Sequence, residues 1–204
     1  MAKIKLPSYI KEGHGRMDDA VIVTRKGVPY MMPYRKRISR TENQEAVRRA
    51  FSTVVDDWKY IGSIIRESWV FYAKDTTATG YNAFVGENVS HRRAGEPLEL
   101  CKGMGEELLV NFTASPGTGG GEVTCEFLTP EEGRHVTFFA RKEVEPGMKS
   151  PISRHDAGAD PASPFTISGL EPRAQYHLYA VVTDARYDSA RTVSQSVAAL
   201  VTAG

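Results

Sequence analysis

The hydrophobic pattern changes its period about halfway along this 204-residue chain, and that change limits the folds open to it. Between about residues 41 and 74, apolar side chains recur every three or four positions, which is typical of amphipathic helices. From about residue 105 onward they alternate or cluster over short runs between Gly- and Pro-rich turns, which is typical of strands. Helices followed by a series of short strands predict an α+β chain with two domains, and we place the boundary between about residues 95 and 105.

The N-terminal region predicts an arm and a small β-hairpin. Residues 1–19 are interrupted by glycine and proline and show no repeating apolar face, so we expect a flexible arm. Short apolar runs on either side of Arg25-Lys26-Gly27 predict a hairpin in which Gly27 takes positive φ. Because Pro29 has no backbone N–H to donate, its strand is expected at a sheet edge. We expect this hairpin to share a domain, residues 20–97, with the helices.

Two helices are predicted, at about residues 41–60 and 63–74. Their short connection favours an antiparallel helical hairpin. The aromatic segment at 80–88 predicts one further helical turn that closes it. The side chains expected between the two helices are Phe51, Trp58, Ile65 and Trp69. At helical spacing the tryptophans are interpreted as core rather than as a ligand-binding aromatic pair.

Residues 105–204 predict an all-β domain. The strands are expected at about residues 108–112, 123–127, 136–140, 165–167, 176–182 and 197–201. Six or seven short strands within roughly 100 residues favour a small antiparallel sandwich.

The segment Ile167-Ser168-Gly169-Leu170-Glu171-Pro172, followed by Tyr176, resembles fibronectin type III modules. The resemblance covers about residues 105–204. It implies that the Tyr176 ring fills the core and that its hydroxyl bonds back to the chain. The family's core tryptophan is absent, with Cys125 or Phe127 in its place, so an immunoglobulin-like sandwich of slightly different topology stays open. The family consists mostly of spacer or adhesive modules and implies no catalysis.

A second resemblance concerns residues 20–90. The patterns that carry it are Thr41-x-x-Gln44-x-x-x-Arg48-x-x-Phe51, then Trp58, Arg66-x-x-Trp69 and Gly80-x-Asn82-x-Phe84-x-x-x-Asn88. They are similar to a widespread group of uncharacterised bacterial and phage-associated proteins with a tryptophan-rich helical hairpin. That resemblance implies little about function.

The sequence contains no recognisable catalytic motif and no recognisable metal-binding motif. There is no Gly-x-Ser-x-Gly and no papain-like cysteine context. Cys125 alternates with apolar neighbours and is interpreted as core, and Cys101 as a free thiol. The five histidines are scattered, and the one candidate Ca²⁺ loop, with Asp156 and Asp160, lacks the other oxygen ligands and is more typical of a solvated turn. We therefore expect no enzyme activity, no cofactor and no metal.

Charge is distributed unevenly although the net charge is only +1. Residues 1–50 hold 12 Lys and Arg against 5 Asp and Glu, whereas residues 105–204 hold 8 against 13. The candidate patch for an anionic partner comprises Arg25, Lys26, Arg35, Lys36, Arg37, Arg40, Arg48 and Arg49. Such a patch fits an acidic protein surface or the phosphates of nucleic acid, or is simply solvated. The small number of nearby aromatic residues favours a solvated or protein-facing role over nucleic acid.

These patterns predict a non-enzymatic structural or assembly protein, a component of a phage-like particle or another multi-subunit assembly with the sandwich projecting outward. Its partners are expected to be protein subunits, through self-association or with other structural proteins, rather than a small-molecule substrate. Nucleic-acid binding through the basic region and carbohydrate adhesion through loops at 143–163 are alternatives. No apolar run is long enough to span a membrane and the start lacks a signal-peptide pattern, so we expect a location in the virion or the cytoplasm.

Overall fold

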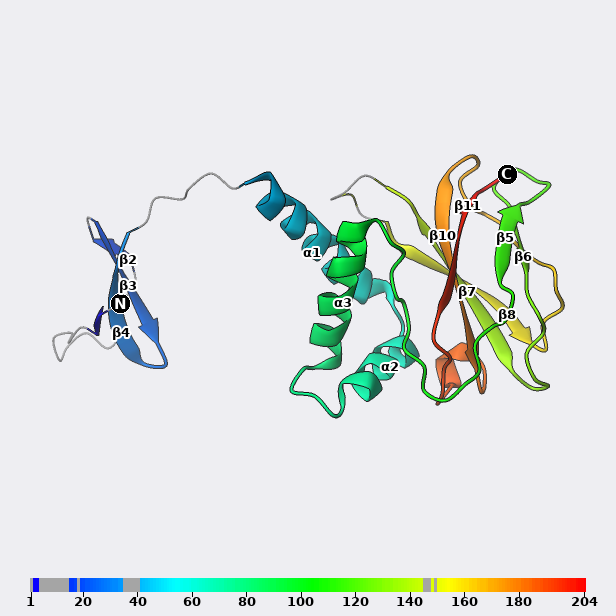
Figure 1. Ribbon diagram of the computed structural model, residues 1–204, viewed down its shortest axis with the longest axis horizontal. Helices are drawn as coiled ribbons and strands as arrows, with labels where there is room; N and C mark the ends of the chain where they lie inside the picture. Colours follow the sequence, from blue (N-terminus) through cyan, green and yellow to red (C-terminus); the bar gives the residue numbers. More distant parts are fainter. Residues whose placement is uncertain (1, 4–14, 18, 35–40, 145–147, 149) are drawn as a thin grey trace. The chain divides into compact units, whose positions relative to one another are not determined.

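The chain divides into two compact units, Met1–Glu42 and Asn43–Gly204. The structure is a computed structural model that describes residues 2–3, 15–17, 19–34, 41–144, 148 and 150–204 (Figure 1). The basic residues expected at 35–37 and 40 therefore lie outside the described residues.

The first unit contains a four-stranded antiparallel sheet in the order β1-β4-β3-β2. Its strands are β1 (Ala2–Lys3), β2 (Gly15–Met17), β3 (Ala20–Arg25) and β4 (Val28–Pro33). β3 and β4 form the expected hairpin. Lys26 and Gly27 have φ angles of 49° and 73°, the positive pair that lets a two-residue turn match the twist of its strands.

Two features of this sheet differ from expectation. Residues 1–19 are not wholly an irregular arm, because β1 pairs with β4 and β2 pairs with β3. β4 also lies inside the sheet rather than at its edge. Pro29 lies opposite Thr24 of β3, and the described residues of β1 pair with Tyr30 and Met31.

The second unit begins with three helices, α1 (Glu42–Tyr60), α2 (Ser63–Ala73) and α3 (Gly80–Ala94). α3 is a full helix where a single turn was expected. The Thr79 side chain caps it by accepting a hydrogen bond from the Asn82 N–H, and Gly95 ends it in the left-handed conformation. Gly80 is required at its start, since a Cβ there would lie 2.7 Å from the backbone nitrogen of Val70 in α2.

The C-terminal part is the antiparallel sandwich that the sequence predicts. One sheet has the order β5-β6-β9, with β5 (Thr113–Pro116), β6 (Val123–Glu126) and β9 (Phe165–Ile167). The other has the order β11-β10-β7-β8, with β7 (His135–Lys142), β8 (Ile152–Ala159), β10 (Gln175–Thr183) and β11 (Val197–Thr202). A 3₁₀ turn, η1 (Tyr187–Ser189), lies between β10 and β11. The first strand starts later than expected, and β8 occupies much of the segment interpreted as a loop.

The two central strands of the four-stranded sheet, β7 and β10, are buried on both faces, and their alternate residues serve two different cores. Phe138 and Leu178 belong to a core shared with β5, β6 and β9. Phe139, Tyr179 and Val181 belong to a second core shared with the three helices. Figure 1 shows the helices on the side of this sheet that faces away from β5 and β6. Three layers therefore share two cores, which explains the continuous apolar runs in these strands.

The helices consequently group with the sandwich and not with the hairpin. The expected domain of residues 20–97 is divided, with its strands in the first unit and its helices in the second. The segment in which the domain boundary was expected, at about residues 95–105, is also part of the helix-facing core, because Leu98, Leu100 and Cys101 are all buried.

The aromatic residues expected in the helical core have different environments. Trp69 is fully buried and meets the Phe84 ring edge-on, while Trp58 is half-buried against the same ring. Phe51 is 50% exposed, so its expected place between the helices is wrong. α1 instead packs a face that includes Ala50, Thr53 and Asp57, whose small or polar side chains an apolar stripe does not reveal.

We predict that Trp69→Phe lowers the free energy of unfolding by about 2 kcal/mol. The indole N–H of Trp69 donates a hydrogen bond to the buried Leu100 carbonyl at 3.1 Å. A phenyl ring cannot donate this bond and is smaller, so it leaves the carbonyl unpaired beside a cavity. The matched control is Trp58→Phe, where a half-buried ring donates no such bond among the described residues, and about half the loss is expected. Urea unfolding followed by far-UV circular dichroism measures both. Equal losses would contradict the role of the hydrogen bond.

Candidate functional site

The two acidic residues of the possible Ca²⁺ loop, Asp156 and Asp160, accept hydrogen bonds from backbone N–H groups. Asp156 lies in β8 and accepts a hydrogen bond from the Gly158 N–H at 3.0 Å. Asp160 accepts from the Gly133 N–H at 2.6 Å. Among the described residues there is no group of three or more His, Cys, Asp or Glu that could hold a metal ion. None of the helices in the described ranges is both long and apolar enough to cross a membrane.

The two cysteines are buried in different cores, Cys101 on the helix side and Cys125 inside the sandwich. Burial raises the pKa of each thiol to about 12. Both therefore remain protonated near neutral pH, and neither is poised as a nucleophile.

The basic residues of the predicted patch are divided between the two units. Arg25 ends β3 and Lys26 follows in the hairpin turn, in the first unit. Arg48 and Arg49 are exposed on α1, in the second unit.

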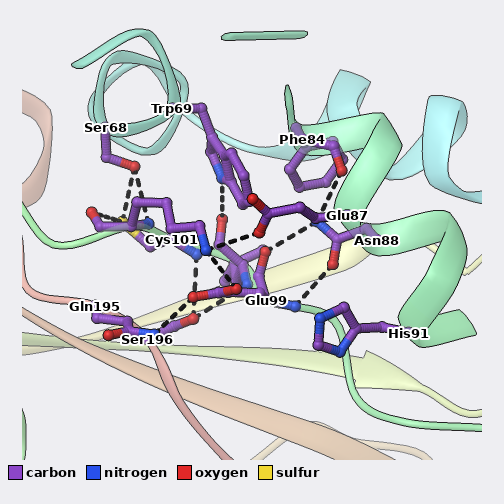
Figure 2. Close-up of polar contacts among 12 residues, drawn as sticks. Ser68, Trp69, Phe84, Glu87, Asn88, His91, Glu99, Cys101, Gln195 and Ser196 are labelled. Carbon is purple, nitrogen blue, oxygen red and sulfur yellow. Dashed lines mark hydrogen bonds and ion pairs between the residues drawn. The ribbon is translucent and has the colours of Figure 1, made fainter. Parts of the chain in front are cut away.

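The most elaborate polar cluster joins α2 and α3 to the segment that follows α3, at the edge of the helix-facing core (Figure 2). The Lys102 ammonium lies 2.7 Å from a carboxylate oxygen of Glu87 and 2.7 Å from one of Glu99. It also lies 5.1 Å from the Trp69 ring centroid and 4.6 Å from that of Tyr72. Two carboxylates and two aromatic faces therefore surround one cation, with its side chain only 16% exposed.

The segment from Leu98 to Lys102 is bonded to helices on one side and to the sandwich on the other. The Asn88 side chain in α3 donates to the Glu99 carbonyl and accepts from the Glu99 N–H, at 3.1 and 2.8 Å (Figure 2). On the other side, the Ser196 hydroxyl accepts from the N–H groups of Leu100 and Cys101, each at 3.1 Å. The sequence pattern predicted a domain boundary in this segment. The signal it overlooked is the alternation of Leu98 and Leu100 with Glu99.

Electrostatic coupling within the cluster is reciprocal. Burial alone would lower the pKa of Lys102, but hydrogen bonds with Glu87 and Glu99 outweigh it and hold that pKa above its usual value. Burial alone would raise the pKa of Glu87, but hydrogen bonds from Lys102 and Tyr72 hold it below its usual value. The charges of Lys102 and Glu87 are thus both retained at neutral pH.

A second ion pair lies deeper, between α1 and β7. Arg141 Nε donates to Asp57 Oδ1 at 3.0 Å, and the two side chains are 0% and 3% exposed. Each charge is tolerated there because the other is present, and removal of one partner from such a pair costs about 3 to 5 kcal/mol. The pair fixes how α1 lies on the sheet.

The predicted role of Tyr176 has a direct counterpart in the sandwich. Its ring is buried in the sandwich core, and its hydroxyl accepts a hydrogen bond from the Glu171 N–H at 3.0 Å. This is the geometry of a tyrosine corner.

Comparison with solved structures finds similarity for the C-terminal half. No family model and no curated protein matches the chain. The FN5 domain of Drosophila Lar is 14% identical, over 48% of this chain and 99% of that one, with a TM-score of 0.35. An Fn3-like protein from Clostridium thermocellum is 7% identical, over 48% and 94% of the two chains, with a TM-score of 0.34. FN3tt is 12% identical, over 47% and 90%, with a TM-score of 0.29.

These similarities concern fold only. The strand orders described above place the C-terminal half among sandwiches of the fibronectin type III kind. None of the comparisons supports the resemblance of residues 20–90 to bacterial and phage-associated proteins, and that resemblance stays a prediction.

We predict that Glu87→Gln lowers the free energy of unfolding by about 1 kcal/mol at pH 7 and by less at acid pH. The folded-state pKa of Glu87 lies below its ordinary value of 4.5, so its contribution is fully present above that value and is lost as pH falls through the folded-state pKa. Denaturant unfolding of the wild-type and Glu87→Gln proteins at pH 7 and at acid pH measures the difference in their free energies of unfolding, which should become smaller at acid pH. Glu67→Gln, an exposed α2 position, is the control and should change little. If Glu87→Gln lowered the free energy of unfolding equally at both pH values, the interaction of the Glu87 carboxylate with Lys102 would not contribute as proposed.

Proposed function

We propose that this protein is a non-enzymatic structural subunit of a multi-subunit assembly, in its most specific form a component of a phage-like particle with the sandwich projecting outward. The observation that carries the proposal is a set of large apolar side chains exposed on α1 and α2. Monomeric proteins rarely expose contiguous apolar patches larger than a few hundred Å², and larger ones commonly mark interaction sites.

The exposed side chains occur at close spacing on both helices. On α1, Val47 and Phe51 lie one turn apart and are 37% and 50% exposed. On α2, the consecutive residues Val70, Phe71 and Tyr72 are 57%, 45% and 47% exposed. The opposite sides of these helices are already committed to the core shared with the sheet. Each large apolar side chain removed from water contributes about 1.5 to 3 kcal/mol when fully buried, so a subunit contact over these positions is favourable.

Charge supports self-association over contact with an unrelated surface. Arg48 lies exposed between Val47 and Phe51, whereas residues 105–204 carry five more acidic than basic side chains (13 against 8). Attraction between the α1 surface of one copy and the acidic part of the next favours association and orients it.

Nucleic-acid binding is the second candidate, because Arg48 and Arg49 are exposed and have no acidic partner among the described residues. Phosphate contacts of this kind carry little sequence information and weaken steeply with salt. Carbohydrate adhesion loses support, because residues 152–159 of the supposed loop form strand β8.

We predict that the full chain grows in mass with concentration between about 1 and 500 μM, across the range of weak specific contacts. Val47→Ser with Phe51→Ser should weaken the association at least about tenfold, because the lost apolar area is worth more than about 1.4 kcal/mol. Light scattering at low and high salt, with and without a short DNA duplex, measures these masses.

Leu128→Ser in the sandwich is the matched control, since Leu128 is 56% exposed but lies outside the helices. A protein that stays monomeric throughout would defeat the assembly proposal. If such a monomer shifted only on addition of DNA at low salt, the nucleic-acid candidate would replace it.

A further inference from the structure

A cleft of about 470 Å³ opens where α1, the end of α3 and one end of the four-stranded sheet meet. It exists because α1 presents small side chains there. Ala46 and Ala50 line the cleft, whereas Val54 and Asp57, one and two turns further along the helix, are buried and fill the space. A volume of this size is typical of small-ligand sites.

Positive charge dominates the lining. Arg49 comes from α1, and Arg92 and Arg93 come from the last turn of α3, while Glu143 is the one carboxylate among the described lining residues. Arg92 has only 14% of its side chain exposed and lies 3.7 Å from a Glu143 oxygen. Within the described residues, Arg49 and Arg93 have no ion-pair partner. The lining therefore has two positive charges in excess, with histidine counted as neutral.

The carboxylates in and beneath the cleft, those of Glu143 and Asp57, are each paired with an arginine. Glu143 Oε2 lies 2.9 Å from His177 Nε2 as well as near Arg92. His177 pairs across the strands with Arg141, the wholly buried arginine whose Nε bonds to Asp57. Both terminal nitrogens of Arg141 have no hydrogen-bond partner among the described residues. The two carboxylates in this region are thus each matched by a cation, and neither compensates Arg49 or Arg93.

We propose that this cleft binds a phosphate group, carried either by a small molecule or by the phosphorylated end of a nucleic acid. Planar guanidinium groups match phosphate oxygens in paired hydrogen bonds, and two unbalanced charges suit a dianion better than a single carboxylate. Asn43, in the first turn of α1, brings the positive end of that helix to the same wall. The site does not depend on assembly into a larger particle.

The test is calorimetric titration of the full chain with pyrophosphate and with inorganic phosphate at constant ionic strength. We expect a dissociation constant below about 1 mM for pyrophosphate. Arg49→Gln with Arg93→Gln should weaken binding at least about tenfold, because each substitution removes a charge-assisted hydrogen bond. Arg48→Gln is the matched control on the same helix, outside the cleft, and should change binding less than about twofold.

A substitution that fills the cleft without changing charge separates a built site from general attraction. Ala46→Leu keeps every arginine and should abolish pyrophosphate binding, while circular dichroism confirms that each variant is folded. The proposal fails if the wild-type chain gives no pyrophosphate binding, if Ala46→Leu binds normally, or if Arg48→Gln loses as much affinity as the double variant.

Two oligonucleotides that differ only in a 5′-phosphate or a 5′-hydroxyl distinguish the sources of the phosphate. If the protein binds pyrophosphate but binds neither oligonucleotide, the ligand is a small molecule. Preference for the 5′-phosphate form supports a nucleic-acid end. Equal binding of both, undiminished by Ala46→Leu, overturns the proposal and assigns the arginines to contacts with the nucleic-acid backbone.

Discussion

Burial of strands β7 and β10 on both faces is the constraint on which the second unit depends. An isolated sandwich of this topology buries one face of each sheet and leaves the other in water. Here Phe139, Tyr179 and Val181 point away from the sandwich core and would be exposed without the helices. The helical layer is therefore part of the hydrophobic stability of the sandwich, and the sandwich is the surface on which the helices fold.

Polar contacts specify how the layers fit together, since apolar burial alone has no direction. The buried pair of Asp57 and Arg141 ties α1 to β7, and the cluster around Lys102 ties α2 and α3 to the segment after α3. That segment is held on both sides by Asn88 and Ser196. Where α1 places Ala46 and Ala50 toward the end of the sheet, packing is incomplete and the cleft remains. The cleft and the core are thus products of the same helix face.

Several elements could be predicted from sequence because local patterns determine them. Strand β9 and the tyrosine corner follow from a turn motif, and the positive-φ hairpin turn follows from Lys26-Gly27. β8 was missed because an edge strand with polar residues on both faces lacks a simple alternation. The exposure of Phe51 was missed because Ala50 and Thr53, which face the core, are not recognised as an apolar stripe. The packing of the helices on the sheet could not be predicted. The continuous apolar runs in β7 and β10 indicate that both faces of these strands are buried, but they do not indicate which element covers the second face.

The most direct test of the shared core is native-state hydrogen exchange on the full chain at increasing denaturant. If the helices and the sheet stabilise one another, the slowest amides of α2, α3, β7 and β10 open in one cooperative event, with a common free energy and a common denaturant dependence. Helices that open at a much lower free energy, while β7 and β10 stay protected, would contradict the account and show that the sandwich is stable without its helical layer.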